Sequence, residues 1–251
     1  MDRILEGKNA IITGSRRGIG RVILEQFSAS GANVWACCRE KDETFECEIQ
    51  ELADKDHVCI TPVYFDLSSE ESIKSGIQQI IKEKITIDIL INNAGIAFGG
   101  LFTMTSLDKL REVFQINYFA QVQIMQVIMR VMMKQKRGSI INMASIGGIE
   151  TTPGYLAYGS SKAALIYATK TASHEVGQYG IRVNAIAPGL TETDMGSYKS
   201  QEEIDRILER SSLRRKADPK EIAECALFLA SDKSSFITGQ VLIADGGRIC
   251  V

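Results

Sequence analysis

The chain has 251 residues, of which 45% are hydrophobic, and 29 Lys and Arg stand against 31 Asp and Glu. A chain of this length can bury a sizeable core, and the balanced charge argues against a surface that mainly binds nucleic acid or an anionic membrane. The longest apolar stretch, Phe119 to Met133, is interrupted by Gln and Arg and is too short to span a bilayer. Residues 1–7 lack the apolar core of a signal peptide. We therefore expect a cytoplasmic protein whose partner is a small molecule, with no nucleic acid and no membrane.

Cysteine and histidine are placed in a way that predicts neither a disulfide framework nor a metal site. No Cys-x-x-Cys pair occurs among the six cysteines: Cys37, Cys38, Cys47, Cys59, Cys225 and Cys250. Cys37 and Cys38 fall inside an apolar run, where packing is expected rather than redox chemistry. His57 and His174 are far apart and have no neighbouring carboxylate cluster, so no metal is expected.

Short apolar runs rich in β-branched residues alternate with longer segments of helical periodicity, a pattern typical of a parallel sheet covered on both faces. The runs predict seven strands: Asn9–Thr13, Asn33–Cys38, Val58–Phe65, Asp88–Asn92, Ser139–Ala144, Arg182–Ala187 and Gln240–Ile243. The segments between them predict helices: Gly18–Ser30, Asp42–Ala53, Ser69–Lys84, Leu107–Gln135, Ala157–Tyr179 and Pro219–Ser231, the last capped by Asp218.

This order predicts an α/β protein with a doubly wound (Rossmann) seven-stranded parallel sheet, helices on both faces, and a single domain over residues 1–251. Residues 190–215 interrupt the alternation just after the sixth strand. They are charged and apolar only at helical intervals, so we expect them to form a lid over the substrate.

Residues 13–20, Thr-Gly-Ser-Arg-Arg-Gly-Ile-Gly, join the first predicted strand to the first predicted helix. Glycine allows a tight turn and a close backbone approach to phosphate, and the helix that follows offers free N–H groups to a pyrophosphate. A plain glycine turn is the alternative, but strand, loop and amphipathic helix follow in the order that a dinucleotide site requires. The residues expected to hold the dinucleotide here are Gly14, Ser15, Arg16, Arg17, Gly18, Ile19 and Gly20.

The end of the second predicted strand bears on the choice between NADP and NAD. An acid there would bind the ribose 2′-hydroxyl of NAD, whereas an arginine would accept the 2′-phosphate of NADP. Cys38 stands where the acid is expected, Arg39 follows it, and Arg17 lies in the glycine loop. The pattern therefore predicts that NADP(H) is preferred over NAD(H). Glu40 opposes this preference unless it lies beyond the ribose or pairs with Lys41.

Asp66 and Leu67 follow the third predicted strand, at the edge where the ligand should lie. We expect both to bind the cofactor, with the Asp66 carboxylate near the adenine amino group. The alternative for Asp66 is an N-cap of the next helix.

Three polar side chains form a candidate catalytic group. Ser145 follows the fifth predicted strand, and Tyr158 and Lys162 lie further along, four residues apart on a predicted helix. Side chains at this spacing share one helix face.

These motifs together resemble the short-chain dehydrogenase/reductase family over the whole chain. The matched features are Thr13-Gly-x-x-x-Gly-Ile-Gly20, Asn92-Asn93-Ala94-Gly95, Asn117, Ser145, Tyr158-x-x-x-Lys162 and Pro188-Gly189. Residues 188–195, 236–240 and 245–247 are similar to β-ketoacyl-acyl carrier protein reductases in particular. The resemblance implies an NADPH-dependent reductase that converts a ketone, above all a 3-oxoacyl thioester, to a secondary alcohol. The alternatives are a family member acting on a free ketone, alcohol, sugar or steroid-like compound, and a non-catalytic NADP(H) sensor.

Ketone reduction places hydride on carbon and leaves negative charge on oxygen, so the site needs a proton donor and a hydrogen-bond donor to that oxygen. Tyr158 is the expected proton donor, and Ser145 the expected hydrogen-bond donor. The Lys162 ammonium is expected to lower the pKa of the Tyr158 phenol by favouring the phenolate.

The resemblance implies further roles for residues of these motifs. Asn117 would be catalytic, by holding a helix kink and a water of a proton relay from Lys162. Tyr158 and Lys162 would also bind the cofactor, Lys162 through the nicotinamide ribose. The remaining cofactor contacts would come from Asn93, Ala94, Gly95, Pro188, Gly189, Thr191 and Thr193.

The expected partners depend on the substrate. An acyl carrier protein is acidic and needs a basic patch, for which Lys134, Lys136 and Arg137 are candidates unless they merely complement a helix C-terminus. Tyr179 stands where the family pattern has an arginine, which leaves this partner open. The resemblance implies a homotetramer, with the apolar helix Val113–Met133 as an interface unless its methionines only pack internally.

Overall fold

The sheet of the computed structural model, which describes residues 3–196 and 200–248, consists of seven parallel strands in the order β3-β2-β1-β4-β5-β6-β7. The strands are β1 Asn9–Thr13, β2 Asn33–Cys38, β3 Ile60–Tyr64, β4 Ile89–Asn92, β5 Gly138–Met143, β6 Ile181–Pro188 and β7 Val241–Ala244. Strand order reverses between β1 and β4, and such a switch point opens a crevice at the carboxyl ends of the strands. The predicted doubly wound α/β fold is confirmed.

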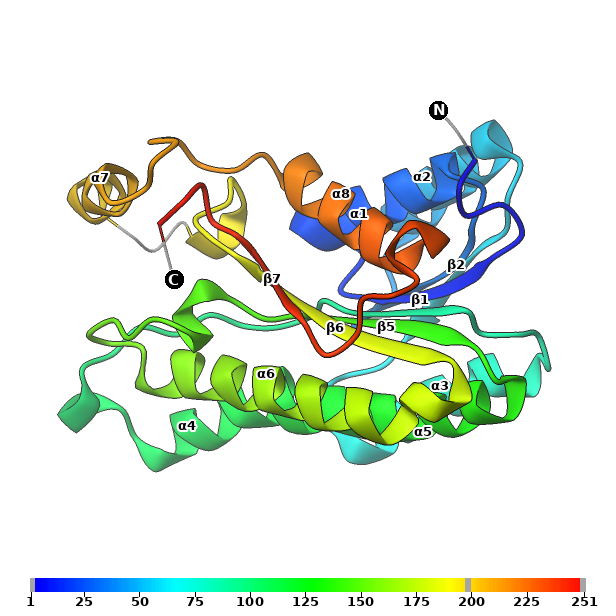
Figure 1. Ribbon diagram of the computed structural model, residues 1–251, viewed down its shortest axis with the longest axis horizontal. Helices are drawn as coiled ribbons and strands as arrows, with labels where there is room; N and C mark the ends of the chain where they lie inside the picture. Colours follow the sequence, from blue (N-terminus) through cyan, green and yellow to red (C-terminus); the bar gives the residue numbers. More distant parts are fainter. Residues whose placement is uncertain (1–2, 197–199, 249–251) are drawn as a thin grey trace.

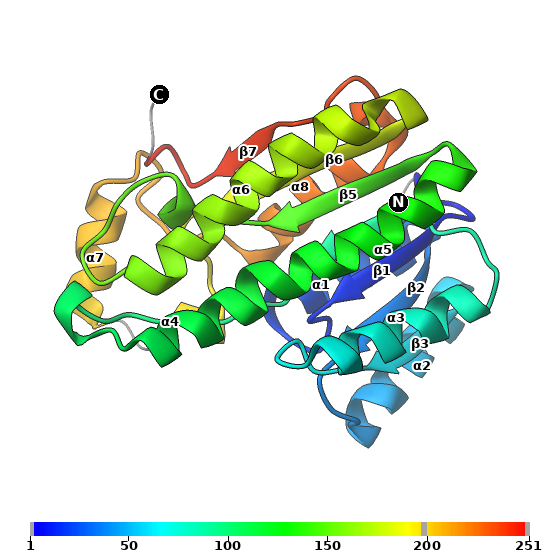
Figure 2. The ribbon, with the colours of Figure 1, turned by 90° about the horizontal axis from the view of Figure 1, so that it is seen from below.

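Helices cover both faces of the sheet (Figure 1). One face carries α1 Gly18–Ala29, α2 Glu43–Asp56 and α8 Pro219–Ala230, and the other carries α3 Glu70–Lys82, α4 Leu107–Phe114, α5 Ala120–Gln135 and α6 Leu156–Val176. Figure 2 shows α5 and α6 running side by side beneath the sheet. The helix α7, Gln201–Glu209, lies beyond the end of the strands.

Alternation along the strands divides the core into two layers. In β1, Ala10 and Ile12 pack with the α1, α2 and α8 side, whereas Ile11 packs with the α3, α5 and α6 side. All three side chains are fully buried. Because both faces of the sheet are covered, the strand is apolar at successive positions, which is why the sequence predicted it correctly.

The observed helices differ from the predicted ones in several places, and α2 extends three residues beyond its predicted end. The segment predicted as one helix over 107–135 is α4 and α5 joined by a π-helical turn, Gln115–Phe119. The helix predicted over 157–179 ends at Val176 and continues as a 3-10 turn to Tyr179. Within residues 190–215, a region predicted only as a lid, Ser200 caps α7 with a capping box. The lid role itself stays a prediction.

Helix caps account for several boundaries. Asp218 forms a capping box at the start of α8, as expected. Ser69, not Asp66, caps α3 by accepting a hydrogen bond from the Ser72 N–H, so the alternative role for Asp66 is wrong. Asp42 caps α2 rather than belonging to it.

Cys37 and Cys38 are buried, as expected for packing, and Cys250 lies outside the described residues. The methionines of α5 pack internally, since Met125 and Met132 are buried in the core. In the described part of the chain, no helix is long and apolar enough to cross a membrane.

Candidate active site

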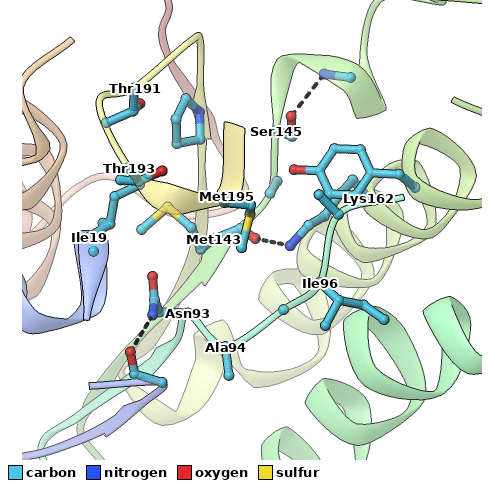
Figure 3. Close-up of a pocket in the computed structure, with 18 of the residues that line it drawn as sticks. Ile19, Asn93, Ala94, Ile96, Met143, Ser145, Lys162, Thr191, Thr193 and Met195 are labelled. Atoms are coloured by element: carbon cyan, nitrogen blue, oxygen red, sulfur yellow. Dashed lines mark hydrogen bonds between the residues drawn. The ribbon is translucent and has the colours of Figure 1, made fainter. Parts of the chain in front are cut away.

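A cavity of about 1540 Å³ opens at the carboxyl ends of the strands. The glycine loop, the ends of β2 to β6, the start of α6 and the α7 region line it. Figure 3 shows Ser145 and Lys162 facing the cavity across from Ile19 and Asn93.

The glycine loop is held tightly against β4. Gly14 has a φ of 69°, in the left-handed region that favours glycine. A Cβ at Gly20 would lie 2.2 Å from the Gly14 carbonyl oxygen. The Asn93 Nδ2 donates to the carbonyls of Thr13 and Gly14, at 3.0 and 3.2 Å. These contacts leave no room for larger side chains at Gly14 and Gly20.

The loop also fits a pyrophosphate. The first turn of α1 has no side-chain cap, so its N–H groups are available as donors. Gly14, Arg16, Arg17, Gly18 and Ile19 line the cavity.

Two predicted loop contacts lie outside the cavity lining. The side chain of Ser15 is buried and donates to the Cys37 carbonyl at 3.3 Å. Gly20 packs against Gly14 within the loop. Both residues support the loop from within and do not line the cavity.

At the end of β2, each arginine beside the cavity has an acidic neighbour. Arg39 pairs with Glu40 at 2.8 Å, so Glu40 does not pair with Lys41. Arg16 pairs with Asp42. Arg17 approaches Asp194 at 3.8 Å, and both side chains are exposed.

Asp66 and Leu67 line the same end of the cavity. The Asp66 Oδ1 accepts a hydrogen bond from the Ser68 N–H at 2.8 Å, and the Asp66 N–H donates to the Ser72 hydroxyl. The carboxylate is therefore fixed by a local turn at the cavity edge.

Asn117 lies at the centre of the π-helical turn and is fully buried. Its amide exchanges two hydrogen bonds with the Ile96 backbone, both at 2.9 Å, and donates to the Ser161 hydroxyl at 3.2 Å. A Cβ at Gly95 would lie 3.0 Å from the Asn117 Oδ1 and 3.4 Å from the Lys162 Nζ. Asn117 thus fixes the loop after β4 next to Lys162.

Ser145, Tyr158 and Lys162 converge on the cavity from β5 and α6. Ser145 begins a 3-10 turn and accepts a hydrogen bond from the Gly147 N–H at 3.0 Å. The Lys162 Nζ lies 6.0 Å from the centroid of the Tyr158 ring and donates to the Met143 carbonyl at 2.7 Å (Figure 3).

The electrostatics of this group differ from the sequence-based expectation. Burial raises the pKa of the Tyr158 phenol, a hydrogen bond with Ser145 lowers it in part, and Tyr155 raises it further. Lys162, which is only 5% exposed, has its pKa lowered to about 8 by desolvation. The Tyr158 pKa is therefore not lowered overall as expected, because desolvation outweighs the contributions that favour the phenolate.

The segment after β6 reaches across the cavity to the glycine loop. Pro188, Gly189, Thr191 and Thr193 line the cavity. A Cβ at Gly18 would lie 3.6 Å from the Thr193 Cγ2, and Thr191 bridges to Ala217. The loop therefore covers the start of α1.

Glu150 and Arg210 lie in the segments 146–156 and 191–210, which were expected to form the substrate pocket, but neither they nor Arg248 was predicted individually as part of the cavity lining. Glu150 accepts hydrogen bonds from both arginines, which lie 60 and 98 residues away along the chain. No local pattern signals contacts at such separations.

The basic patch predicted to receive an acyl carrier protein lies away from the cavity mouth. Lys134, Lys136 and Arg137 immediately precede β5, whereas the cavity lies beyond its other end, about 20 Å along the strand. Arg137 pairs with the buried Asp88 at 3.1 Å. Tyr179 is half-buried and packs against the core. The patch therefore cannot sit at the mouth of this chain's own cavity.

The comparisons with known proteins agree with the geometry. A family profile described as enoyl-(acyl carrier protein) reductase matches residues 14–248. A solved structure named as a short-chain dehydrogenase/reductase family protein is 31% identical, with a TM-score of 0.85, and the match covers 97% of this chain and 98% of the other. This chain belongs to the short-chain dehydrogenase/reductase family.

Relatives in the short-chain dehydrogenase/reductase family match the chain over nearly its full length. The 3-oxoacyl-[acyl-carrier-protein] reductase of Chlamydia muridarum is 38% identical over 98% of this chain and 99% of its own length. The enzyme of the same name from Aquifex aeolicus is also 38% identical, with the same coverage. A structure of 7α-hydroxysteroid dehydrogenase with NADH and 7-oxo glycochenodeoxycholic acid is 32% identical, with a TM-score of 0.91, over 98% of this chain and 96% of the other. The protein is therefore an oxidoreductase of a family that uses nicotinamide cofactors.

Proposed function

We propose that this protein reduces a 3-oxoacyl thioester to the 3-hydroxyacyl thioester with NADPH. The observation that carries the proposal is the meeting of Ser145, Tyr158 and Lys162 in one cavity with a glycine loop that fits a pyrophosphate. The names of the relatives that are 38% identical over nearly the whole chain supply the substrate class.

When bound, a nicotinamide dinucleotide would supply the hydride that reduces the carbonyl carbon. The glycine loop would hold its pyrophosphate, and Asp66 and Leu67 would flank the adenine. Asn93, Ala94 and Gly95 would line its path toward Lys162. Pro188, Gly189, Thr191 and Thr193 would contact the nicotinamide carboxamide.

Arg39 favours NADP(H), because it directly follows β2, where Cys38 replaces an acid, and Arg17 of the glycine loop lines the same cavity. A 2′-phosphate must compete with Glu40 for Arg39. We therefore expect a preference for NADPH that this acid limits.

The protein's own side chains perform the proton step. As hydride reaches the carbonyl carbon, the Tyr158 hydroxyl gives its proton to the carbonyl oxygen, and the Ser145 hydroxyl donates a hydrogen bond to the same oxygen. A raised pKa keeps the Tyr158 phenol protonated at neutral pH, so the acid is ready for reduction. Lys162, whose pKa is about 8, is mostly protonated at pH 7 and stabilises the phenolate that forms.

Asn117 acts by fixing the loop that carries Gly95, and so sets the space beside the Lys162 ammonium. A water in a proton relay from Lys162 would lie on this side. Residues 190–215 would close over the bound ketone as a lid.

A second candidate function is reduction of a free ketone, including steroid-like compounds. It is favoured by Tyr179 in place of an arginine and by the position of the Lys134–Arg137 patch at the far end of β5. Both reactions would use the same catalytic residues. Only the reduction of a 3-oxoacyl thioester would have an acyl carrier protein as partner.

We also propose a homotetramer. Three large apolar side chains remain exposed in the single chain: Leu107 of α4, Phe119 of the π-helical turn and Tyr167 of α6. Light scattering tests this, and a monomer contradicts it.

The function is tested by assaying the purified protein with acetoacetyl thioesters, both on coenzyme A and on acyl carrier protein, beside a panel of free ketones. Each is measured with NADPH and with NADH. We expect the highest kcat/KM for the thioesters with NADPH. A free ketone that exceeds every thioester favours the second candidate, and activity retained by Tyr158→Phe contradicts both.

A further inference from the structure

We propose that Glu150 is a positioning residue that couples the turn beginning at Ser145 to α7 and the C-terminal segment, through a carboxylate shared by Arg210 and Arg248. The proposal rests on the ketone reduction proposed for this cavity.

The turn from Ser145 to Glu150 is one hydrogen-bonded unit. The Gly148 N–H donates to the Ser145 carbonyl at 3.0 Å, and the Ile149 and Glu150 N–H groups donate to the Ile146 carbonyl at 2.9 and 2.8 Å. The Ser145 side chain caps the same turn. A displacement of Glu150 is therefore transmitted along five residues to Ser145.

The end of α7 and the segment after β7 form a second unit. The Leu213 N–H and the Ser211 hydroxyl both donate to the Gly246 carbonyl, at 3.0 and 2.9 Å. The Ser212 hydroxyl donates to the Gly247 carbonyl at 3.1 Å. Residues 210–213 and 245–248 are thus joined by several bonds, independently of Glu150.

Glu150 connects the two units. One carboxylate oxygen accepts a hydrogen bond from Arg210, and the other accepts one from the Arg248 Nε at 3.0 Å. The Arg248 side chain is only 9% exposed and that of Glu150 23%, so water screens this cluster less than a surface pair. Without the carboxylate, two neighbouring guanidinium groups would remain unneutralised and would repel each other.

All three side chains line the cavity. The cluster therefore closes the cavity wall between the Ser145 turn and α7. It holds the Ser145 hydroxyl in position to donate to the ketone oxygen. Within the described part of the chain, the Glu150 carboxylate pairs with Arg210 and Arg248, which lie apart in sequence from the glycine loop and from β2. Loss of the cluster should change ketone binding and leave dinucleotide binding unaltered.

Glu150→Gln tests this, since it keeps the shape of the side chain and removes its charge. Glu48→Gln is the matched control: Glu48 also pairs across two elements, with Arg21 at 2.7 Å, but neither residue lines the cavity. Steady-state kinetics are measured with the best ketone and NADPH, melting temperatures are recorded, and amide hydrogen exchange is followed with no substrate present.

For Glu150→Gln we expect a KM for the ketone about tenfold higher, a lower kcat, and a KM for NADPH within about twofold of the unmodified protein. Amide hydrogen exchange should become faster in residues 201–213 and 145–150, while the melting temperature changes little. The control should match the unmodified protein in every measurement. An unchanged KM for the ketone overturns the proposal, and so does a parallel rise of both KM values with a lower melting temperature.

Arg210→Gln keeps the test decisive if Glu150→Gln does not fold, because the Arg210 side chain is 61% exposed. It should reproduce the rise in KM for the ketone, and the double variant should be no worse than Glu150→Gln alone. Additive effects contradict the shared cluster. If no ketone is reduced by the unmodified protein, the proposed function fails, and hydrogen exchange alone still decides the coupling: unchanged exchange in both segments overturns it.

Discussion

Replacing the buried lysine of the active site should stabilise the protein while it abolishes turnover. Lys162 is 5% exposed, and desolvation lowers its pKa from 10.5 to about 8. A shift of this size corresponds to about 3 kcal/mol by which the folded state disfavours the charged lysine, at about 1.4 kcal/mol per pKa unit. Lys162→Met removes that cost and leaves the Met143 carbonyl without its hydrogen bond, a loss of about 1 kcal/mol. The net expectation at pH 7 is a gain of about 2 kcal/mol in the free energy of unfolding.

The pH dependence gives this prediction a sign that can be checked. Below pH 8 the lysine is charged in both states, so the folded protein bears the full cost. Between pH 8 and 10.5 the folded state has lost the proton and the unfolded state still binds it, so the stability of the unmodified protein rises with pH relative to the variant. The advantage of Lys162→Met should therefore be largest near pH 7 and shrink as the pH approaches 10.5.

Urea denaturation at pH 7, 8, 9 and 10, without added dinucleotide, measures the difference. Lys170→Met, an exposed position on the same helix, is the control and should show no pH-dependent change. A Lys162→Met protein less stable than the unmodified one at pH 7 refutes the reasoning, as does an advantage equally large at pH 10. Loss of kcat in the more stable variant would show that this residue is retained for function.

Four further substitutions test the rest of the site. Tyr158→Phe should lower kcat by about a thousandfold through loss of the proton donor, with an unchanged circular dichroism spectrum. Gly20→Ala places a Cβ 2.2 Å from the Gly14 carbonyl, so it should weaken dinucleotide binding at least about tenfold in a fluorescence titration. Arg39→Ala should raise the Kd for NADPH several-fold and leave that for NADH unchanged, whereas Glu40→Gln should lower the Kd for NADPH, since it frees Arg39. Equal effects on both dinucleotides would contradict the proposed role of Arg39.

The fold was predictable because burial on both faces of the sheet leaves a signal in every strand. β1 and β2 have the predicted boundaries, and the other strands differ by two residues or fewer at each end. Once the strands are ordered, the carboxyl-end rule brings Ser145, Asn93 and Pro188 to one crevice, where the structure has them. Long apolar runs and position relative to a strand are local properties, which a sequence records directly.

The failures come from properties that depend on the surroundings of a side chain. The i, i+4 spacing puts Tyr158 and Lys162 on one helix face, but it does not show that the Lys162 Nζ donates to Met143 or that desolvation dominates both pKa values. The position of the basic patch, Lys134 to Arg137, could have been predicted correctly from the sequence. Residues 134–137 directly precede β5, so the direction of that strand already puts them at the edge opposite Ser145.

The cluster of Glu150, Arg210 and Arg248 could not be predicted from local sequence, and it bears on which residues determine the choice of substrate. Its three members come from a turn, a helix end and a segment after the last strand, and each alone is an ordinary surface charge in sequence. Only the fold brings them to one wall of the cavity, while the glycine loop and the catalytic candidates come from motifs that the sequence displays. Since the same fold supports reductases of different substrates, specificity must reside in contacts of this kind rather than in the shared motifs. The substrate of the proposed reduction is therefore better sought through Glu150, Arg210 and Arg248 than through Ser145, Tyr158 and Lys162, which the reduction of any ketone would require.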